Sequence, residues 1–149
     1  MFRPEASMVM PCACDQVWAV LADGWLYPLW VVGATHMRAV DEGWPGVGTK
    51  LHHSAGIWPL QISDDTEVLE VDPGSRLVLQ ARAFVAGSAR VEITLEPLGD
   101  DRCEVTMYEY ADSGPGWFVP TALQAPAVHS RNTECLSRLR DLAVNRHHA

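Results

Sequence analysis

The chain has 149 residues, 48% hydrophobic and 20% charged, a composition typical of one soluble domain spanning residues 1–149. Lysine and arginine number 11 and aspartate and glutamate 19, so the formal net charge is −8. A protein this acidic gains no counterion release from phosphates, which disfavours nucleic acids and anionic membrane surfaces as partners. No apolar run approaches the roughly 18 residues of a membrane-spanning helix, and no basic-then-apolar signal opens the chain, so we expect a cytoplasmic protein without membrane insertion.

The cysteine pattern fits that compartment. Cys12 and Cys14 are too close in sequence for an unstrained disulfide, and no C-x-x-C pair is present to build a zinc site. We therefore expect these two, together with Cys103 and Cys135, to be free thiols. The histidines and cysteines lack metal-ligand spacing and no glycine-rich phosphate-binding motif occurs, so we expect neither a metal nor a cofactor.

The first thirty residues predict a strand followed by short helices. β-compatible residues run from Ser7 to Pro11. A helix is expected over 14–24, because apolar residues recur there at helical spacing and Gly24 can end it in the left-handed conformation. The aromatic-rich segment 25–30 indicates a second helical turn or a tight loop.

Residues 35–110 predict a meander of six strands. The breaks between them are short and rich in glycine, proline and aspartate, and breaks this short join antiparallel neighbours. Alternation along the fifth strand places apolar side chains on one face and charged ones on the other, so one face must be covered. The expected strands are Thr35–Val40, Thr49–Ser54, Leu60–Val71, Arg76–Phe84, Ala89–Pro97 and Arg102–Tyr110.

The cover is an amphipathic helix that begins after the Pro120–Pro126 stretch and runs to about Asn145. One helix about 10 Å wide does not fully close a curved sheet of six or seven strands. The sheet positions that should face the helix are small or mid-sized, such as Ala81 and Val91. We therefore expect a cavity between sheet and helix, the alternative being a core filled by the chain's own tryptophans and leucines.

Four segments carry a resemblance to a known superfamily: residues 17–24 followed by Trp30, residues 52–56, residues 64–68 with Asp72 and Pro73, and Arg131-Asn132 leading into Leu136 and Leu139. With the order of elements, they make the whole chain resemble the START/Bet v 1-like (SRPBCC) superfamily, most closely its polyketide cyclase/dehydratase-like branch. The resemblance implies an α+β helix-grip fold, with a curved antiparallel sheet of six or seven strands, two short N-terminal helices and one long C-terminal helix. The superfamily includes lipid carriers, hormone receptors and aromatase/cyclases, so the resemblance alone implies no single activity.

Two polar residues of the C-terminal helix and one of the sheet stand out. Asn132 lies in the middle of the apolar stripe, where a polar side chain must find a partner or border water. Arg131 flanks the stripe, and Glu109 shares the apolar parity of its strand. We expect Glu109 to meet Arg131 or Asn132 at the cavity mouth, either as a static pair that locks helix to sheet or as a ligand contact.

One histidine is a candidate acid or base. His53 should point inward and His52 outward, because adjacent strand residues project to opposite faces. His53 can titrate near neutral pH, although a buried histidine bonded to a neighbour is the simpler interpretation. Asp64 or Asp65 could partner it, and a bulge after Pro59 would exchange which of the two faces the cavity. The candidate catalytic residues are therefore His53, Asp64 and Glu109.

Several aromatic residues lie in expected loops or at element ends, where rings commonly form the mouths of pockets: Trp30, Trp58, Trp117 and Phe118. Together with His53, Glu109, Arg131 and Asn132 they make up the expected ligand-binding residues.

Three functions fit these features. The first is binding of a small hydrophobic or aromatic molecule, lipid- or polyketide-like, in the cavity. The second is a cyclase or dehydratase-type enzyme in which His53 and an inward carboxylate move protons. The third is an interaction or regulatory protein with a vestigial pocket. Convergence of His53 with an acidic side chain would favour the enzyme, and the edge strands of an open meander are compatible with a homodimer.

Overall fold

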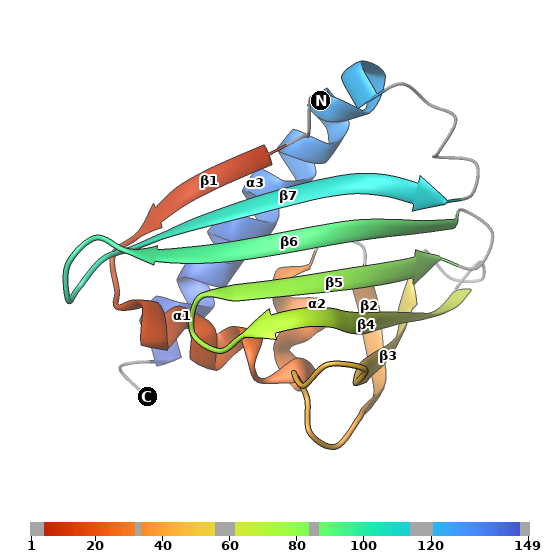
Figure 1. The fold of residues 1–149 in the computed structure, drawn as a ribbon, viewed down its shortest axis with the longest axis horizontal. Coiled ribbons are helices and arrows are strands. Elements are labelled where there is room, and N and C mark those ends of the chain that lie inside the picture. Colours follow the sequence, from red (N-terminus) through yellow and green to blue (C-terminus); the bar gives the residue numbers. More distant parts are fainter. Residues whose placement is uncertain (1–4, 32–33, 56–61, 84–86, 114–120, 147–149) are drawn as a thin grey trace.

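The computed structural model describes residues 5–31, 34–55, 62–83, 87–113 and 121–146 (Figure 1). Its centre is one seven-stranded antiparallel sheet with the order β1-β7-β6-β5-β4-β3-β2. All the expected strands are present, and their described ends differ from the expected ones by at most three residues. The largest difference is at the last strand, which was expected to end at Tyr110 and ends at Ser113. The strands are β1 (Glu5–Met10), β2 (Ala34–Val40), β3 (Lys50–Ala55), β4 (Ile62–Asp72), β5 (Arg76–Ala83), β6 (Gly87–Pro97) and β7 (Cys103–Ser113).

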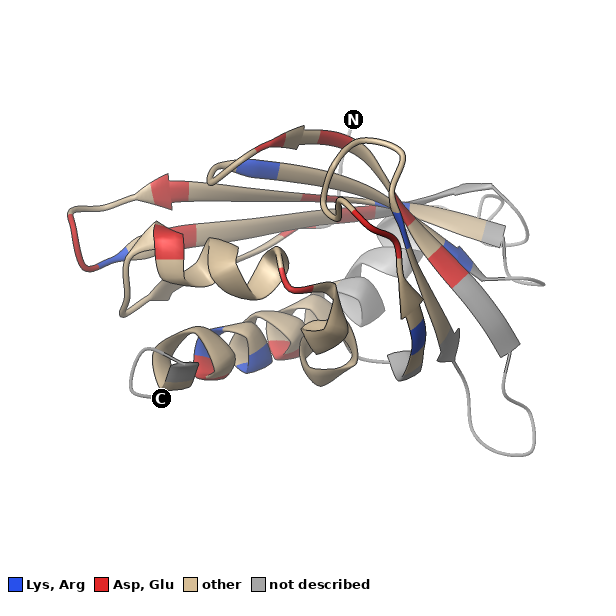
Figure 2. Cartoon of the chain, turned by 90° about the horizontal axis from the view of Figure 1, so that it is seen from below, with Lys and Arg blue, Asp and Glu red and all other residues tan. Residues whose placement is uncertain are grey.

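Three α-helices and one 3-10 turn complete the fold, which is the expected α+β helix grip. At the start of the first helix the side chain of Gln16 accepts a hydrogen bond from the backbone N–H of Ala13 (3.2 Å), and Asp15 lies in the first turn. Figures 1 and 2 show the helices on the same face of the sheet. They are α1 (Cys14–Leu21), the 3-10 turn η1 (Gly24–Leu26), α2 (Tyr27–Trp30) and α3 (Thr121–Arg146).

Gly24 has a different role from the expected one. It begins η1 instead of ending α1 in the left-handed conformation, and it is not among the described glycines with positive φ. A Cβ atom at this position would lie 2.5 Å from Cδ2 of Leu51 and 2.9 Å from Cγ1 of Val40. Glycine is therefore required by the close approach of η1 to the sheet and not by its backbone angles.

The long helix α3 starts earlier than the sequence indicated. It begins at Thr121, so Pro126 falls inside it and not before it. Proline lacks the N–H that would bond to the carbonyl of residue 122, and the cost of that one lost bond is outweighed by the contacts of the remaining turns. Further along, α3 contacts β1, β7, α1 and α2.

The core lies between these helices and the covered face of the sheet. Among its fully buried side chains are Met10, Val17, Val20, Leu77, Ile93, Val105, Leu136 and Leu139. The opposite face carries ion pairs such as Arg76 with Glu92 and Arg82 with Glu67. Figure 2 shows acidic residues on strands, turns and helices, with basic residues scattered between them. None of the described helices is both long and apolar enough to cross a bilayer.

A disulfide between Cys14 and Cys103 corrects the expectation of four free thiols. It joins the start of α1 to the start of β7 across 89 positions of sequence, with the two Cα atoms 4.9 Å apart. Cys12 and Cys135 are buried and are not joined in a disulfide. The expectation was wrong because spacing along the chain shows only which cysteines are local neighbours, whereas the fold brings these two distant ones together.

Candidate functional site

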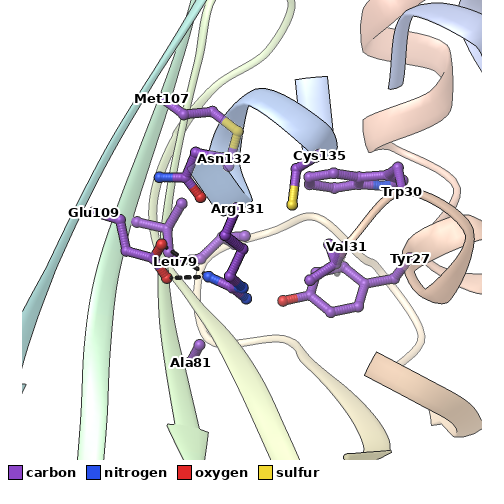
Figure 3. Close-up of a pocket in the computed structure, with 11 residues that line it drawn as sticks. Tyr27, Trp30, Val31, Leu79, Ala81, Met107, Glu109, Arg131, Asn132 and Cys135 are labelled. Atoms are coloured by element: carbon purple, nitrogen blue, oxygen red, sulfur yellow. Dashed lines mark hydrogen bonds and ion pairs between the residues drawn. The ribbon is translucent and has the colours of Figure 1, made fainter. Parts of the chain in front are cut away.

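A pocket opens between α2, α3 and strands β5, β6 and β7 (Figure 3). The space not filled by atoms is about 330 Å³, which includes the part that opens to solvent. A hollow therefore lies between the sheet and the helices, where the sequence predicts one. The lining residues are Tyr27, Trp30, Val31, Leu79, Ala81, Val91, Met107, Glu109, Arg131, Asn132 and Cys135.

The sheet wall of the pocket follows from strand register. Leu79 lies opposite Val91, and Val91 lies opposite Glu109, so three neighbouring strands present these residues on one face. Ala81 follows Leu79 by two residues and Met107 precedes Glu109 by two, so both share that face. Two of these five, Ala81 and Val91, are the small and mid-sized positions that the sequence placed beneath the helix.

The helical wall comes from α2 and α3. Tyr27 and Trp30 are three residues apart on α2, and their rings meet edge to face with centroids 5.5 Å apart. Arg131, Asn132 and Cys135 lie within about one turn of α3. Figure 3 shows the two aromatic rings on one side of the pocket and the side chains of the sheet on the other, with the α3 residues between them.

Glu109 and Arg131 form the ion pair that links sheet and helix. One guanidinium nitrogen of Arg131, Nη1, donates to both carboxylate oxygens of Glu109, at 2.7 and 2.8 Å. The Glu109 side chain is 9% exposed and that of Arg131 39%. Burial alone would lower the pKa of Arg131, but the attraction and hydrogen bonds of Glu109 outweigh it and the pKa is raised. The predicted contact is thus confirmed, with Arg131 as the partner, while its role in ligand binding stays a prediction.

Asn132 faces the pocket and is fully buried. Neither its Oδ1 nor its Nδ2 atom has a hydrogen-bond partner within the described part of the chain. A buried amide without partners is unusual, because desolvation is then not compensated. The hydrogen-bonding capacity of this amide is therefore unused within the described part of the chain.

His53 lies behind the pocket wall and not in it. Its Nε2 is 2.9 Å from the hydroxyl oxygen of the buried Thr66, which is also 3.2 Å from the hydroxyl oxygen of Tyr27. The rings of His53 and Tyr27 stack with centroids 5.3 Å apart. Burial raises the pKa of Tyr27 to about 12, although the hydrogen bond with Thr66 acts in the opposite direction. A buried chain of polar groups therefore connects His53 to a residue of the lining.

The two histidines of β3 point as expected. His53 is 6% exposed, whereas the half-exposed His52 is 2.9 Å from a carboxylate oxygen of Asp41. That hydrogen bond holds the pKa of Asp41 below its usual value. His52 therefore belongs to the surface of the molecule.

The open choice between Asp64 and Asp65 is partly resolved. Asp65 lies 3.6 Å from Arg82, an exposed residue of the outer face, so Asp65 does not reach the pocket. Asp64 is the register partner of His53 on β4, and its side chain lies outside the described part of the structure. A carboxylate partner for His53 therefore stays a prediction.

The expected aromatic residues divide into two groups. Trp30 is buried and lines the pocket. Trp58, Trp117 and Phe118 lie outside the described residues.

Besides apolar lining residues such as Val31 and Met107, three residues of the site with a hydroxyl or thiol group were missed from the sequence. Tyr27 precedes Trp30 by three residues and Cys135 follows Asn132 by three, so helical spacing could have placed both in the lining. Thr66 has no such signal, because a buried threonine in a strand is ordinarily a packing residue.

The described side chains include no cluster of three histidine, cysteine, aspartate or glutamate residues that could hold a metal ion. The polar chemistry available in the described lining is that of a carboxylate, a guanidinium, a carboxamide, a phenol, an indole N–H and a thiol.

The sequence from residue 1 to residue 144 matches the model of a protein family described as polyketide cyclase / dehydrase and lipid transport. The chain belongs to this family. The resemblance drawn from the sequence is thereby confirmed. No curated protein matches the sequence.

Solved structures of the same shape support the assignment of the fold. A conserved protein from Geobacillus kaustophilus is 14% identical with a TM-score of 0.73, and 97% of this chain and 96% of that one are covered. The ZhuI aromatase/cyclase from a Streptomyces species is also 14% identical, with a TM-score of 0.68 and coverage of 97% and 94%. Ara h 8.0201 is 13% identical, with a TM-score of 0.69 and coverage of 97% and 98%. Identities this low show a shared fold and no more.

Proposed function

We propose that this member of the family binds a small hydrophobic or aromatic molecule, lipid- or polyketide-like, in the pocket between the sheet and α3. The observation that carries the proposal is the lining itself. Aliphatic, aromatic and sulfur-containing side chains form most of its wall, and the charged groups within it are the paired Glu109 and Arg131. The family description, which joins polyketide cyclisation with lipid transport, supports a largely apolar ligand.

The physical basis is the removal of apolar surface from water. Trp30, Leu79 and Met107 are already shielded by the protein, and a ligand in the pocket would bury its own apolar surface against them. Each square ångström buried contributes about 25 cal/mol. Since the charges of Glu109 and Arg131 neutralise each other, the described lining has no net charge with which to attract an ion.

Filling the pocket tests the proposal. Prodan, a neutral naphthalene ketone dye whose emission shifts to the blue in apolar surroundings, should bind the wild-type protein and lose most of its affinity in Ala81→Phe. The matched control is Gln80→Phe, one residue away on the same strand and on the opposite face, which should bind the dye as the wild type does. Equal dye binding by all three proteins would contradict the proposal.

The natural ligand is sought by native mass spectrometry. Protein purified from its own cells should carry a small molecule in the wild type and in Gln80→Phe, and less of it in Ala81→Phe. A bound mass present equally in all three would place that molecule elsewhere on the protein.

A second candidate function is acid–base chemistry on a bound carbonyl compound, and the chain His53–Thr66–Tyr27 favours it. The Tyr27 hydroxyl would donate a hydrogen bond to the carbonyl oxygen while Glu109, the carboxylate of the described lining, takes up the proton of the neighbouring carbon and leaves an enolate. Exchange of the protons beside the carbonyl of tetralone in deuterated water measures this directly. The enzyme hypothesis predicts exchange above the buffer rate that is lost in Tyr27→Phe and reduced in His53→Gln. Exchange at the buffer rate in the wild type would contradict it.

The Cys14–Cys103 disulfide argues against the cytoplasmic location expected from the sequence, because cytosolic thiols are mostly kept reduced. Trapping thiols with an alkylating agent in acid-quenched cells decides the matter. Alkylation of all four cysteines supports the cytoplasm, and alkylation of only Cys12 and Cys135 contradicts it. The expected homodimer stays a prediction that sedimentation can test.

A further inference from the structure

The amide of Asn132 is a polar group of the lining for which the described part of the fold supplies no partner. It is fully buried, and no hydrogen bond reaches its oxygen or its nitrogen from the described residues. It stands in the middle of α3, opposite the sheet wall and beside the Glu109–Arg131 pair (Figure 3). A folded protein ordinarily satisfies such a group, so an amide kept here points to a partner that comes from outside the chain.

The neighbouring polar groups of the pocket are already engaged. Both carboxylate oxygens of Glu109 accept from Arg131, and the Tyr27 hydroxyl is paired with Thr66. A ligand that competed for these groups would have to break a bond within the protein. Asn132 gains hydrogen bonds without any such loss.

We propose that Asn132 anchors the ligand and selects for one chemical class: a neutral, flat ring with an N–H or O–H donor beside a carbonyl or ring-nitrogen acceptor, as in a lactam. The inference rests on the ligand-binding function proposed above and adds the polar edge that the ligand must carry. A carboxamide offers one acceptor and one donor side by side, so it pairs with an edge of the complementary pattern, as Asn does with adenine in DNA recognition. Rotation of the amide by half a turn lets it read the two groups in either order.

Charge and shape of the pocket narrow the class further. A charged ligand would add an uncompensated charge to a pocket whose own charges are already paired, which disfavours it. The edge-to-face rings of Tyr27 and Trp30 offer aromatic surface on the side that faces the sheet. A flat ring therefore fits this wall better than a branched aliphatic chain.

A matched series of probes tests the inference by isothermal titration calorimetry. The series is naphthalene, isoquinolone, its N-methyl derivative, which lacks the donor, and a C-methyl isoquinolone, which keeps the donor at the same size. The wild type should bind isoquinolone and the C-methyl compound roughly tenfold more tightly than the N-methyl compound, the discrimination expected of one well-made polar contact. In Asn132→Leu this ratio should fall to about one, whereas the exposed neighbour Thr133→Val should keep it.

The outcomes separate the two proposals. Binding of naphthalene and of all the lactams with equal affinity by the wild type would overturn the role of Asn132 and leave the pocket proposal standing. The same holds if Asn132→Leu keeps the full preference for the donor. Failure of every probe to bind the wild type would overturn both proposals. The wild-type series alone can contradict the inference, so the test does not depend on whether Asn132→Leu folds.

Discussion

Asn132 ought to lower the stability of the ligand-free protein. Its amide is desolvated without compensation. Asn132→Leu keeps the number of side-chain heavy atoms and removes the polar ones, so it should raise the free energy of unfolding by about 1 to 3 kcal/mol. Urea denaturation of the two ligand-free proteins measures the difference. A clear loss of stability would mean that the amide makes structural hydrogen bonds and is not reserved for a ligand.

The Glu109–Arg131 pair should contribute moderately to the free energy of unfolding, because Arg131 is partly exposed and solvent screens its charge. Glu109→Gln should lower the free energy of unfolding by about 1 to 2 kcal/mol, since the guanidinium then loses its counter-charge. A double-mutant cycle with Arg131→Met isolates the pair from the effects of each side chain alone. A coupling free energy of zero would show that the ion pair makes no net contribution to stability.

Ionisation of Tyr27 should lower the stability of the protein at alkaline pH. Its pKa in the folded state is about 12, against 10.0 for the free side chain, so folding favours the protonated phenol. Stability from this group is complete below pH 10 and is lost as the pH rises through 12, by about 2 to 3 kcal/mol in total.

Ultraviolet absorbance resolves this ionisation. One of the three tyrosines should titrate near pH 12, and that step should be absent in Tyr27→Phe. The variant should also lose less stability than the wild type between pH 10 and pH 12. A wild type in which all three tyrosines ionise near pH 10 would contradict the burial of the Tyr27 hydroxyl.

The sequence reveals a site residue when its type is unusual for its position in a helix or strand. Glu109 and Asn132 stood out because each is a polar residue at an apolar position of its element. Tyr27 and Thr66 did not, because an aromatic residue and a threonine are ordinary core residues and their hydrogen bond joins positions 39 residues apart. A contact between distant segments leaves no trace in local periodicity.

Secondary-structure elements are held together at one point by a covalent bond. The Cys14–Cys103 disulfide fixes the start of α1 to the start of β7, so the double variant Cys14→Ser/Cys103→Ser should unfold at lower urea, with a loss of about 2 to 4 kcal/mol. Reduction of the wild type should produce the same loss, and Cys12→Ser should not. Identical urea midpoints for the oxidised wild type and the double variant would contradict the bond.

The elements themselves were largely predictable. The strands were found because alternation and glycine- or proline-rich breaks are local signals. The start of α3 was placed too late because Pro126 indicated a break, whereas packing of the later turns carries the helix through it. Gly24 was expected to end a helix, and only the approach of η1 to Leu51 in the folded chain reveals why no side chain fits there.

The overall arrangement explains why a pocket forms at all. The helices cover one face of a seven-stranded sheet. Helix α1 contacts α3, β6 and β7, and the fully buried side chains of the core include Leu77, Ile93 and Leu139. Toward α2 the wall residues Ala81 and Val91 are too small to fill the remaining space. The sequence predicted this hollow from the widths of sheet and helix, but its polar lining required the three-dimensional pairing of α2, α3 and β7.

The most direct measurement is a methyl-resolved NMR titration of the wild type with naphthalene. If the hollow is a ligand site, the shifts will concentrate on the methyl groups of Val31, Leu79, Val91 and Met107, while those of Val105 and Leu139 in the buried core stay in place. Shifts spread evenly over both groups, or none at saturating naphthalene, would show that the space between sheet and helix does not take a ligand.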